Sequence, residues 1–166
     1  MIRKAKQYSR PRKPFEKTRI EEENKLAKTY ALKNKKEIWK TIAKIEYFRK
    51  RAMSLANESQ EERSVFINKL KDLGLNVNNT ADILGLKVED LLERRLPTIV
   101  FKKKLANTTK QARQMVTHKR VWVEGRIVNV PSYLVPVEKE SKITVKEIKV
   151  NVAPSKQEAT VGVENE

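Results

Sequence analysis

The sequence has no cysteine, so it can form neither a disulfide bond nor a zinc site built on thiolates. It has one histidine, His118, and four glycines. Neither a phosphate-binding loop of the G-x-x-x-x-G-K type nor a metal-binding H-E-x-x-H motif occurs. Because groups suited to nucleophilic, acid–base or metal chemistry are so scarce, we expect no enzymatic activity, no metal ion and no cofactor.

Long apolar stretches are missing as well. No run approaches the roughly 18 apolar residues of a membrane-spanning helix, and the first residues, MIRKAKQYSRPRK, lack the apolar segment of a secretory signal. Mean hydropathy is −0.68 and only 6% of residues are aromatic. We therefore expect a soluble, cytoplasmic protein with a modest core, folded as one domain or two small ones.

What the chain has in excess is positive charge. Lysine and arginine number 37 against 21 acidic residues, a net charge of +16. Residues 1–57 carry a net +12 and residues 88–135 a net +6, while residues 58–87 and 136–166 each carry a net −1. Two cationic blocks separated by a near-neutral spacer favour a polyanionic partner, and nucleic acid is the first candidate.

Residues 1–15 form a basic arm that Pro11 and Pro14 keep out of a helix. Two interpretations stay open: a disordered terminus, or a segment that orders on RNA through cations such as Arg10 and Arg12. Residues 16–93 predict a helical subdomain. The sequences Asn34-x-x-Glu37 and Ser59-x-x-Glu62 resemble capping boxes that start two of its helices.

The helix predicted over 34–56 has a strongly basic face. Its members recur at helical spacing and are Lys36, Lys40, Lys44, Tyr47 and Arg51. Like charges four residues apart on a helix cost about 0.2–0.5 kcal/mol per pair, so a surface without a function would more often mix signs. Either this face is simply solvated, or it is a ridge that faces phosphates, which is the hypothesis we prefer.

Residues 94–152 predict a second unit of mixed structure. Leu96-Pro97 suits a helix start, with Ile99, Val100, Phe101 and Leu105 expected in its core. Thr108 and Gln111 predict the capping box of a helix ending near His118. The alternation at 121–123, Glu124-Gly125 and then Arg126 predict a hairpin with a two-residue loop. Residues 142–152 predict one more strand, and 153–166 a flexible tail.

The residues just described resemble a known family. R-R-L, K-Q-A-R-Q-M-V, V-x-V-E-G-R-I-V and V-P-S-Y follow one another as in the RNA-binding module named after ribosomal protein S-four. The chain over roughly residues 10–150 resembles the archaeal and eukaryotic branch of that family. The resemblance implies an α+β fold: a helical N-terminal subdomain, then a module with two to three short helices packed on a small antiparallel β-hairpin sheet.

By matching position, the resemblance assigns RNA contacts to Arg95, Thr109, Lys110, Gln111, Arg113, Gln114, His118, Lys119 and Arg126. The adjoining motif also points Arg94 towards RNA, and the module further offers Lys102, Lys103, Lys104 and Arg120. Outside the module, charge alone adds Lys36, Lys40, Lys44, Arg51, Arg10 and Arg12. The helix dipole would by itself also explain basic residues at 94 and 95. Trp122 has two open interpretations, stacking on an unpaired base or packing against protein.

The resemblance further implies a structural protein of the small ribosomal subunit. Such proteins bind a helix junction in the 5′ domain of the ribosomal RNA, act early in assembly, and lie near the place where messenger RNA enters, beside the S-three and S-five proteins. The alternative is a free-standing RNA-binding factor or the RNA-binding part of an RNA-modifying enzyme. A membrane-surface protein is disfavoured, since no helix joins a basic face to a strongly apolar one.

Overall fold

The first half of the protein is helical and the second half adds a small sheet, as seen in a computed structural model that describes residues 6–146. The helices of the first half are α1 (Lys17–Thr29), α2 (Lys35–Leu55), α3 (Gln60–Asp72), α4 (Thr80–Gly85) and α5 (Val88–Glu93). The second half holds α6 (Leu96–Lys102), α7 (Thr109–Thr117), β1 (Val121–Val123), β2 (Arg126–Ile127), α8 (Val137–Glu140) and β3 (Ile143–Val145). The predicted α+β class is confirmed.

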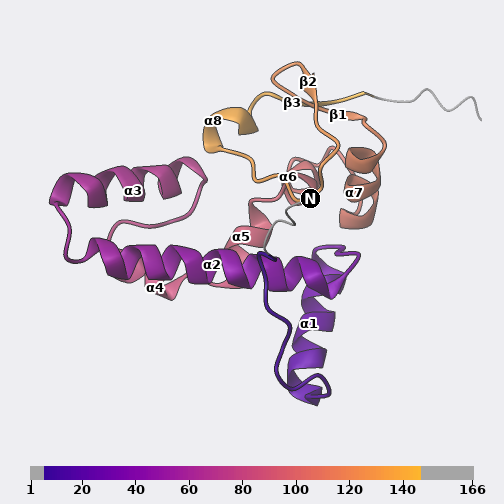
Figure 1. The fold of residues 1–166 in the computed structure, drawn as a ribbon. Helices are drawn as coiled ribbons and strands as arrows, with labels where there is room; N and C mark the ends of the chain where they lie inside the picture. Colours follow the sequence, from indigo (N-terminus) through magenta and orange to yellow (C-terminus); the bar gives the residue numbers. More distant parts are fainter. Residues whose placement is uncertain (1–5, 147–166) are drawn as a thin grey trace, which may run out of the picture.

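Helix α2 is the long axis of the first half (Figure 1). Helix α1 projects from one end of α2, while α3 runs beside the other end. The module formed by α6, α7 and the sheet lies over the end nearer α1. Helix α1 and the module therefore both lie at the start of α2.

Two apolar cores hold these layers together. The helical core is formed by buried residues of α2 to α5, including Phe48, Leu70 and Ile83. The module core is formed by residues from 96 to 143, including Val100 and Val116. Leu134 follows the sheet hairpin in sequence yet packs on the helical core, so the two cores meet there. The division between 16–93 and 94–152 stays a prediction.

Two core predictions were wrong. Phe101 is 39% exposed and Leu105 37% exposed, because α6 buries the positions before them, Ile99 and Val100, and then ends at Lys102. The capping predictions had mixed outcomes. Ser59 Oγ accepts a hydrogen bond from the Glu62 N–H at 3.4 Å, but Asn34 makes no side-chain capping bond.

The sheet is antiparallel with strand order β2-β1-β3. Its hairpin loop has the predicted two residues: Glu124 at φ 51° and Gly125 at φ 75°, the pair of positive angles typical of a turn that matches the strand twist. β3 pairs Ile143 with Val123. The strand predicted over 142–152 is thus observed at its start, while residues 147–152 and the tail at 153–166 lie outside the described residues, as do residues 1–5 of the arm.

Candidate nucleic-acid interface

Helix α7 has one apolar and one polar face. The Thr108 Oγ1 fixes its first turn by accepting a hydrogen bond from the Gln111 N–H at 3.1 Å. The Gln111 side chain bonds the Asn107 N–H at 2.9 Å instead of completing the predicted box with Thr108. Ala112 and Val116 are buried in the module core. The predicted contact residues on the opposite face are exposed or, for Thr109, partly exposed: Thr109, Lys110, Gln111, Gln114, His118 and Lys119.

A groove of about 730 Å³ separates the polar face of α7 from α1 and the loop that follows it. Lys110, Gln114 and Thr117 line one wall; Lys28 and Lys33 line the other. Cations that are about 80 residues apart in the chain thus face one another, and we call this the α1–α7 groove. The sequence patterns did not single out Lys28 or Lys33, since only the folded chain shows that they oppose α7.

Glu37 of α2 binds two of the predicted contact residues. Arg113 donates to both of its carboxylate oxygens, at 2.6 and 3.1 Å, and Arg95 donates to Glu37 Oε2 at 2.6 Å. Burial raises the pKa of Glu37, but the hydrogen bonds from Arg113 and Arg95 outweigh it, and the net pKa lies below the ordinary 4.5. This cluster joins α2 to α6 and α7.

Arg94 makes a second link between the two cores. It donates to the backbone oxygens of Leu73 and Val135, each at 2.9 Å, and to Glu140 Oε2 at 3.0 Å. Gly74, at φ 76°, leaves the space: a Cβ there would lie 2.5 Å from the Arg94 Cζ. Such a position suits only glycine, for both conformational and steric reasons.

The structure therefore revises the role expected of these three arginines. Arg94, Arg95 and Arg113 do not project into solvent; their guanidinium groups are held by acceptors of the protein itself. We call them the junction arginines. Their partners are distant in sequence, 58 residues away for Arg95 and 76 for Arg113 with Glu37, so no local pattern around these arginines indicated the pairing.

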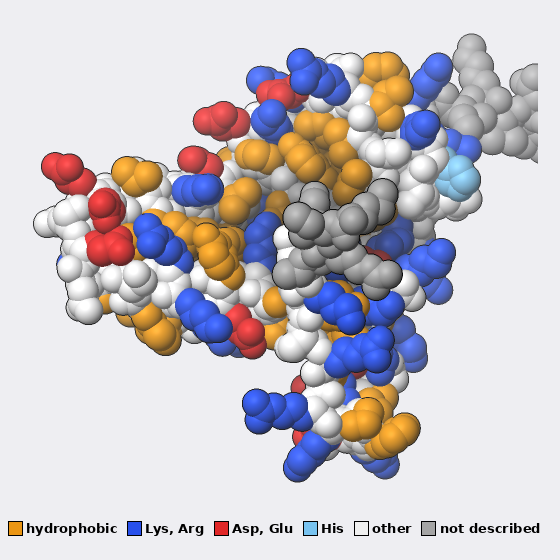
Figure 2. Space-filling model, viewed as in Figure 1, with side chains coloured by type: hydrophobic (Ala, Val, Ile, Leu, Met, Phe, Trp, Pro, Cys, Tyr) orange, Lys and Arg blue, Asp and Glu red, His pale blue; other side chains and the backbone are white. Residues whose placement is uncertain are grey.

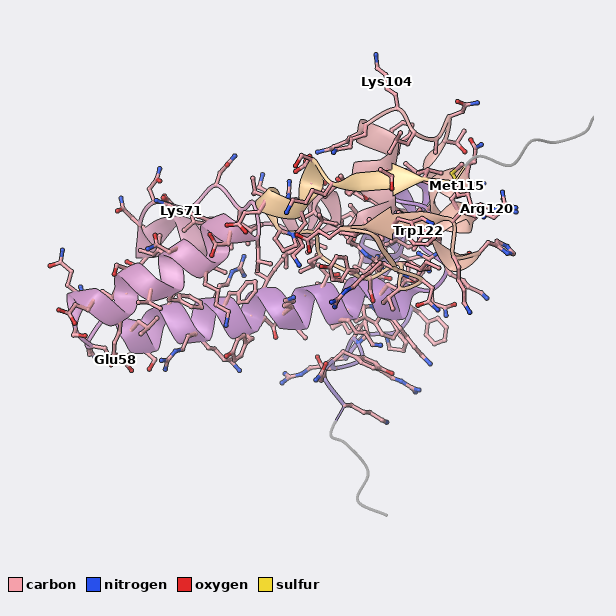
Figure 3. The ribbon with its side chains drawn as sticks, turned by 90° about the horizontal axis from the view of Figure 1, so that it is seen from above. Glu58, Lys71, Lys104, Met115, Arg120 and Trp122 are labelled. Carbon is pink, nitrogen blue, oxygen red and sulfur yellow. The ribbon has the colours of Figure 1, made fainter. Side chains whose placement is uncertain are left out.

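The three consecutive lysines after α6 have different surroundings. Lys102 pairs with Glu93 at 2.7 Å on the exposed surface, and Lys103 donates to the backbone oxygen of Glu140. Lys104, at φ 58°, is exposed and points outward from the module (Figure 3). Within residues 6–146, Lys104 is the one of the three without an acidic or carbonyl partner.

The predicted ridge on α2 is exposed. Lys36 and Lys40 have no acidic partner among the described residues, whereas Arg51 pairs with Glu58 at 3.7 Å. The Lys44 ammonium lies 5.8 Å from the centre of the Phe48 ring, and although the residue is exposed, partial desolvation of its ammonium group lowers the pKa of Lys44. Figure 2 shows basic side chains gathered where α1 meets α2, and acidic ones towards α3.

The arm is attached to the helical subdomain over its described part. The rings of Tyr8 and Trp39 lie 6.2 Å apart, and Arg19 donates to the backbone oxygens of Lys13 and Pro14 at 2.8 and 3.1 Å. Arg10 and Arg12, between these contacts, are exposed. The arm thus adds cations to the region where α1 meets α2.

The hairpin of β1 and β2 also carries exposed basic side chains. Arg126 in β2 is exposed, and Arg120 just before β1 is partly exposed. Trp122 is half-buried on the sheet face opposite the buried Val121 and Val123. Figure 3 shows Arg120 and Trp122 on the side of the molecule away from Glu58, which precedes α3.

No cluster of three or more histidine or acidic side chains over residues 6–146 could hold a metal ion. Across the same part of the chain, none of the helices combines the length and apolar character needed to span a membrane.

Comparison with known proteins agrees with this arrangement. A family model described as the S4 domain matches residues 94–141. A protein of Picrophilus torridus called small ribosomal subunit protein uS4 is 42% identical over 151 residues, which cover 86% of this chain and 82% of the relative. Proteins of the same name are 43% identical in Thermoplasma acidophilum, with 86% of this chain and 76% of the relative covered, and 40% identical in Methanococcus aeolicus, with 86% and 84% covered.

Proposed function

The chain belongs to the uS4 family of small ribosomal subunit proteins, and from this premise we propose that it binds small-subunit ribosomal RNA as a structural constituent of that subunit. The observation that carries the proposal is the α1–α7 groove, where lysines of the helical subdomain and of the S4 domain face one another. These lysines have no acidic partner among the described residues. When such a lysine binds a phosphate, the counterion condensed on the RNA is released, and this release contributes to affinity. The relatives' names favour this function over a free-standing RNA-binding factor.

Within this function, the exposed cations and amides are the proposed RNA contacts. They are Lys28, Lys33, Lys36, Lys40, Lys44, Lys104, Thr109, Lys110, Gln111, Gln114, His118, Lys119, Arg120, Arg126, Arg10 and Arg12. The junction arginines are positioning residues: Arg113 and Arg95 hold α7 and the start of α6 against Glu37 of α2, and Arg94 holds the module to the end of α3. Amide side chains such as Gln114 reach 2′-hydroxyl groups, which distinguish RNA from DNA.

Finer features of the proposal come from the family resemblance. The RNA target is a helix junction in the 5′ domain, contacted during early assembly, and the mature position lies beside the S-three and S-five proteins near the place where messenger RNA enters. The protein acts in the cytoplasm as part of the ribosome and without catalysis. Separate cationic surfaces on α2, α7 and the hairpin support this, because they suit a folded RNA in which several helices meet.

Binding to a 5′-domain transcript tests the proposal. We expect the wild-type chain to bind that transcript and to co-sediment with small subunits. Replacing Lys28 and Lys110, one from each wall of the groove, together by alanine should weaken binding and leave the fold intact. Replacing Lys69 and Lys71 of α3 is the matched control, because both are exposed lysines outside the groove. Equal losses in the two variants, or no co-sedimentation of the wild type, would refute the proposal.

A further inference from the structure

A second groove, of about 790 Å³, lies between α2 and the segment that follows β2. Lys40, Lys44 and Tyr47 of α2 line one side, and Pro131 and Ser132 line the other. We call it the α2–module groove. Its volume falls in the range of roughly 300–1,000 Å³ in which proteins enclose a single small ligand.

The groove combines an apolar floor with a mostly cationic rim, in which the one acidic side chain, Glu37, is already bound by Arg95 and Arg113. Leu91 and Leu134 contribute to the floor. Tyr47 is 62% exposed although it is a large aromatic side chain, so one face of its ring is available to a ligand. Lys40 and Lys44 stand at successive turns of α2 beside it. Aromatic and apolar faces next to cations match the two parts of a nucleotide, its base and its phosphate.

A buried donor at the end of the groove points to the same ligand. Arg95 lines the groove and is 6% exposed. One of its terminal nitrogens donates to Glu37, but the other, Nη1, is buried without a hydrogen-bond partner among the described residues. A buried, unsatisfied donor is unfavourable, and an acceptor that entered the groove, such as a base carbonyl or a phosphate oxygen, would satisfy it.

We propose that the α2–module groove takes up one unpaired nucleotide of the bound RNA. Its base lies against Tyr47 and the apolar floor, its phosphate lies between Lys40 and Lys44, and an oxygen accepts from Arg95 Nη1. Nucleotides within a duplex do not fit, because their faces are already stacked on neighbouring bases. This inference rests on the proposed RNA-binding function and adds to it the kind of nucleotide recognised and the site.

The test compares two hairpin RNAs, one with a single bulged 2-aminopurine nucleotide and one fully paired, on the full-length chain. We expect the wild type to bind the bulged hairpin about fivefold or more tightly than the paired one, as stacking on one aromatic side chain allows. Tyr47→Ala should abolish this difference while keeping the affinity for the paired hairpin. Tyr47→Phe, which keeps the ring, should restore it.

Phe15→Ala is the matched control, since Phe15 is 91% exposed and does not line the groove; it should keep the full preference. Equal wild-type affinity for the two hairpins, or a preference that survives in Tyr47→Ala, would overturn the inference. The inference would also be overturned if free nucleoside monophosphates competed with the same affinity as the bulged hairpin, because the natural ligand of the groove would then be a free nucleotide and not a nucleotide of the RNA. Retained binding to the 5′-domain transcript in these cases would show that the groove proposal alone has failed.

Discussion

The junction arginines and the lysines of the outer surface carry the same charge but differ in what surrounds them. Arg94, Arg95 and Arg113 lie between the two cores, with oxygen acceptors at 2.6–3.1 Å. Lys36 and Lys110 are exposed, with no acidic partner in the described part of the chain. The first set uses its charge chiefly to hold the fold together, with Arg95 Nη1 left over for the proposed nucleotide, whereas the second keeps its charge available to a partner.

The residue types fit this division. A guanidinium group has five donors in a fixed plane and can satisfy several acceptors at once, as Arg94 does with three. A lysine ammonium is a compact, strongly hydrated charge that costs little to leave in water. Net charge alone therefore overstates the RNA-binding surface, and the predictions below test the two sets separately.

The largest expected effect is on stability. Arg95→Ala removes one partner of the buried cluster with Glu37, and we expect the free energy of unfolding to fall by about 3 kcal/mol. Urea unfolding followed by circular dichroism measures it. Lys36→Ala is the control and should change stability by less than about 0.5 kcal/mol. Similar losses in the two variants would remove the distinction between the sets.

The second prediction concerns the space beside Arg94. Gly74→Ala combines a positive φ with a clash against the guanidinium group, and we expect a loss of about 2 kcal/mol in the free energy of unfolding. Gly125→Ala has nearly the same φ, 75°, in open space, and should cost about 1 kcal/mol. If the free energy of unfolding falls by the same amount in both variants, the clash with Arg94 does not add to the cost of Gly74→Ala.

A single outer lysine should affect binding and not folding. For Lys110→Ala we expect the log–log salt dependence of RNA affinity to fall by about 0.7–0.9, which is roughly a fivefold loss at physiological salt. Titration of a 5′-domain transcript at several salt concentrations measures this slope. Lys71→Ala, on α3 and outside the α1–α7 groove, should leave the slope unchanged. A change in unfolding free energy with Lys110→Ala would contradict its assignment to the outer set.

The smallest effect should appear in the pH dependence of stability. Because the folded pKa of Glu37 lies below 4.5, its stabilising contribution is complete above pH 4.5 and is lost as the pH falls through the folded pKa. The effect is limited because burial raises the pKa of Glu37 while the two arginines lower it. Glu37→Gln should flatten the curve of unfolding free energy below pH 4.5, while the exposed Glu61→Gln should not. An unchanged slope in Glu37→Gln would show that the carboxylate is not stabilised.

The fold of the α7–hairpin segment could be predicted because its signals are local. Thr108 caps the helix, Val116 lies on its apolar face, and Gly125 permits the turn, each within a few residues of its partner. The short helix α8 was missed, since its four residues, VEKE, carry no apolar periodicity.

The candidate site could be predicted only in part. The exposed face of α7 follows from helical spacing, whereas the opposing wall with Lys28 and Lys33 depends on how α1 packs. The sequence predicts Glu37 as part of a helix cap, because its spacing from Asn34 is the only signal that the local sequence provides. In the structure its side chain binds two arginines from the second half of the chain, and no local pattern indicates such pairing.

The acceptors of Arg94 have a consequence for the order in which the protein matures during its own synthesis. They belong to residues 73, 135 and 140, so the contact cannot be completed until the last of these has left the exit tunnel. The contact between the end of α3, beside Gly74, and Arg94 therefore stays incomplete until the segment that contains residues 135 and 140 has been synthesised. A chain truncated before residue 135 should therefore be far more sensitive to protease than the full-length chain.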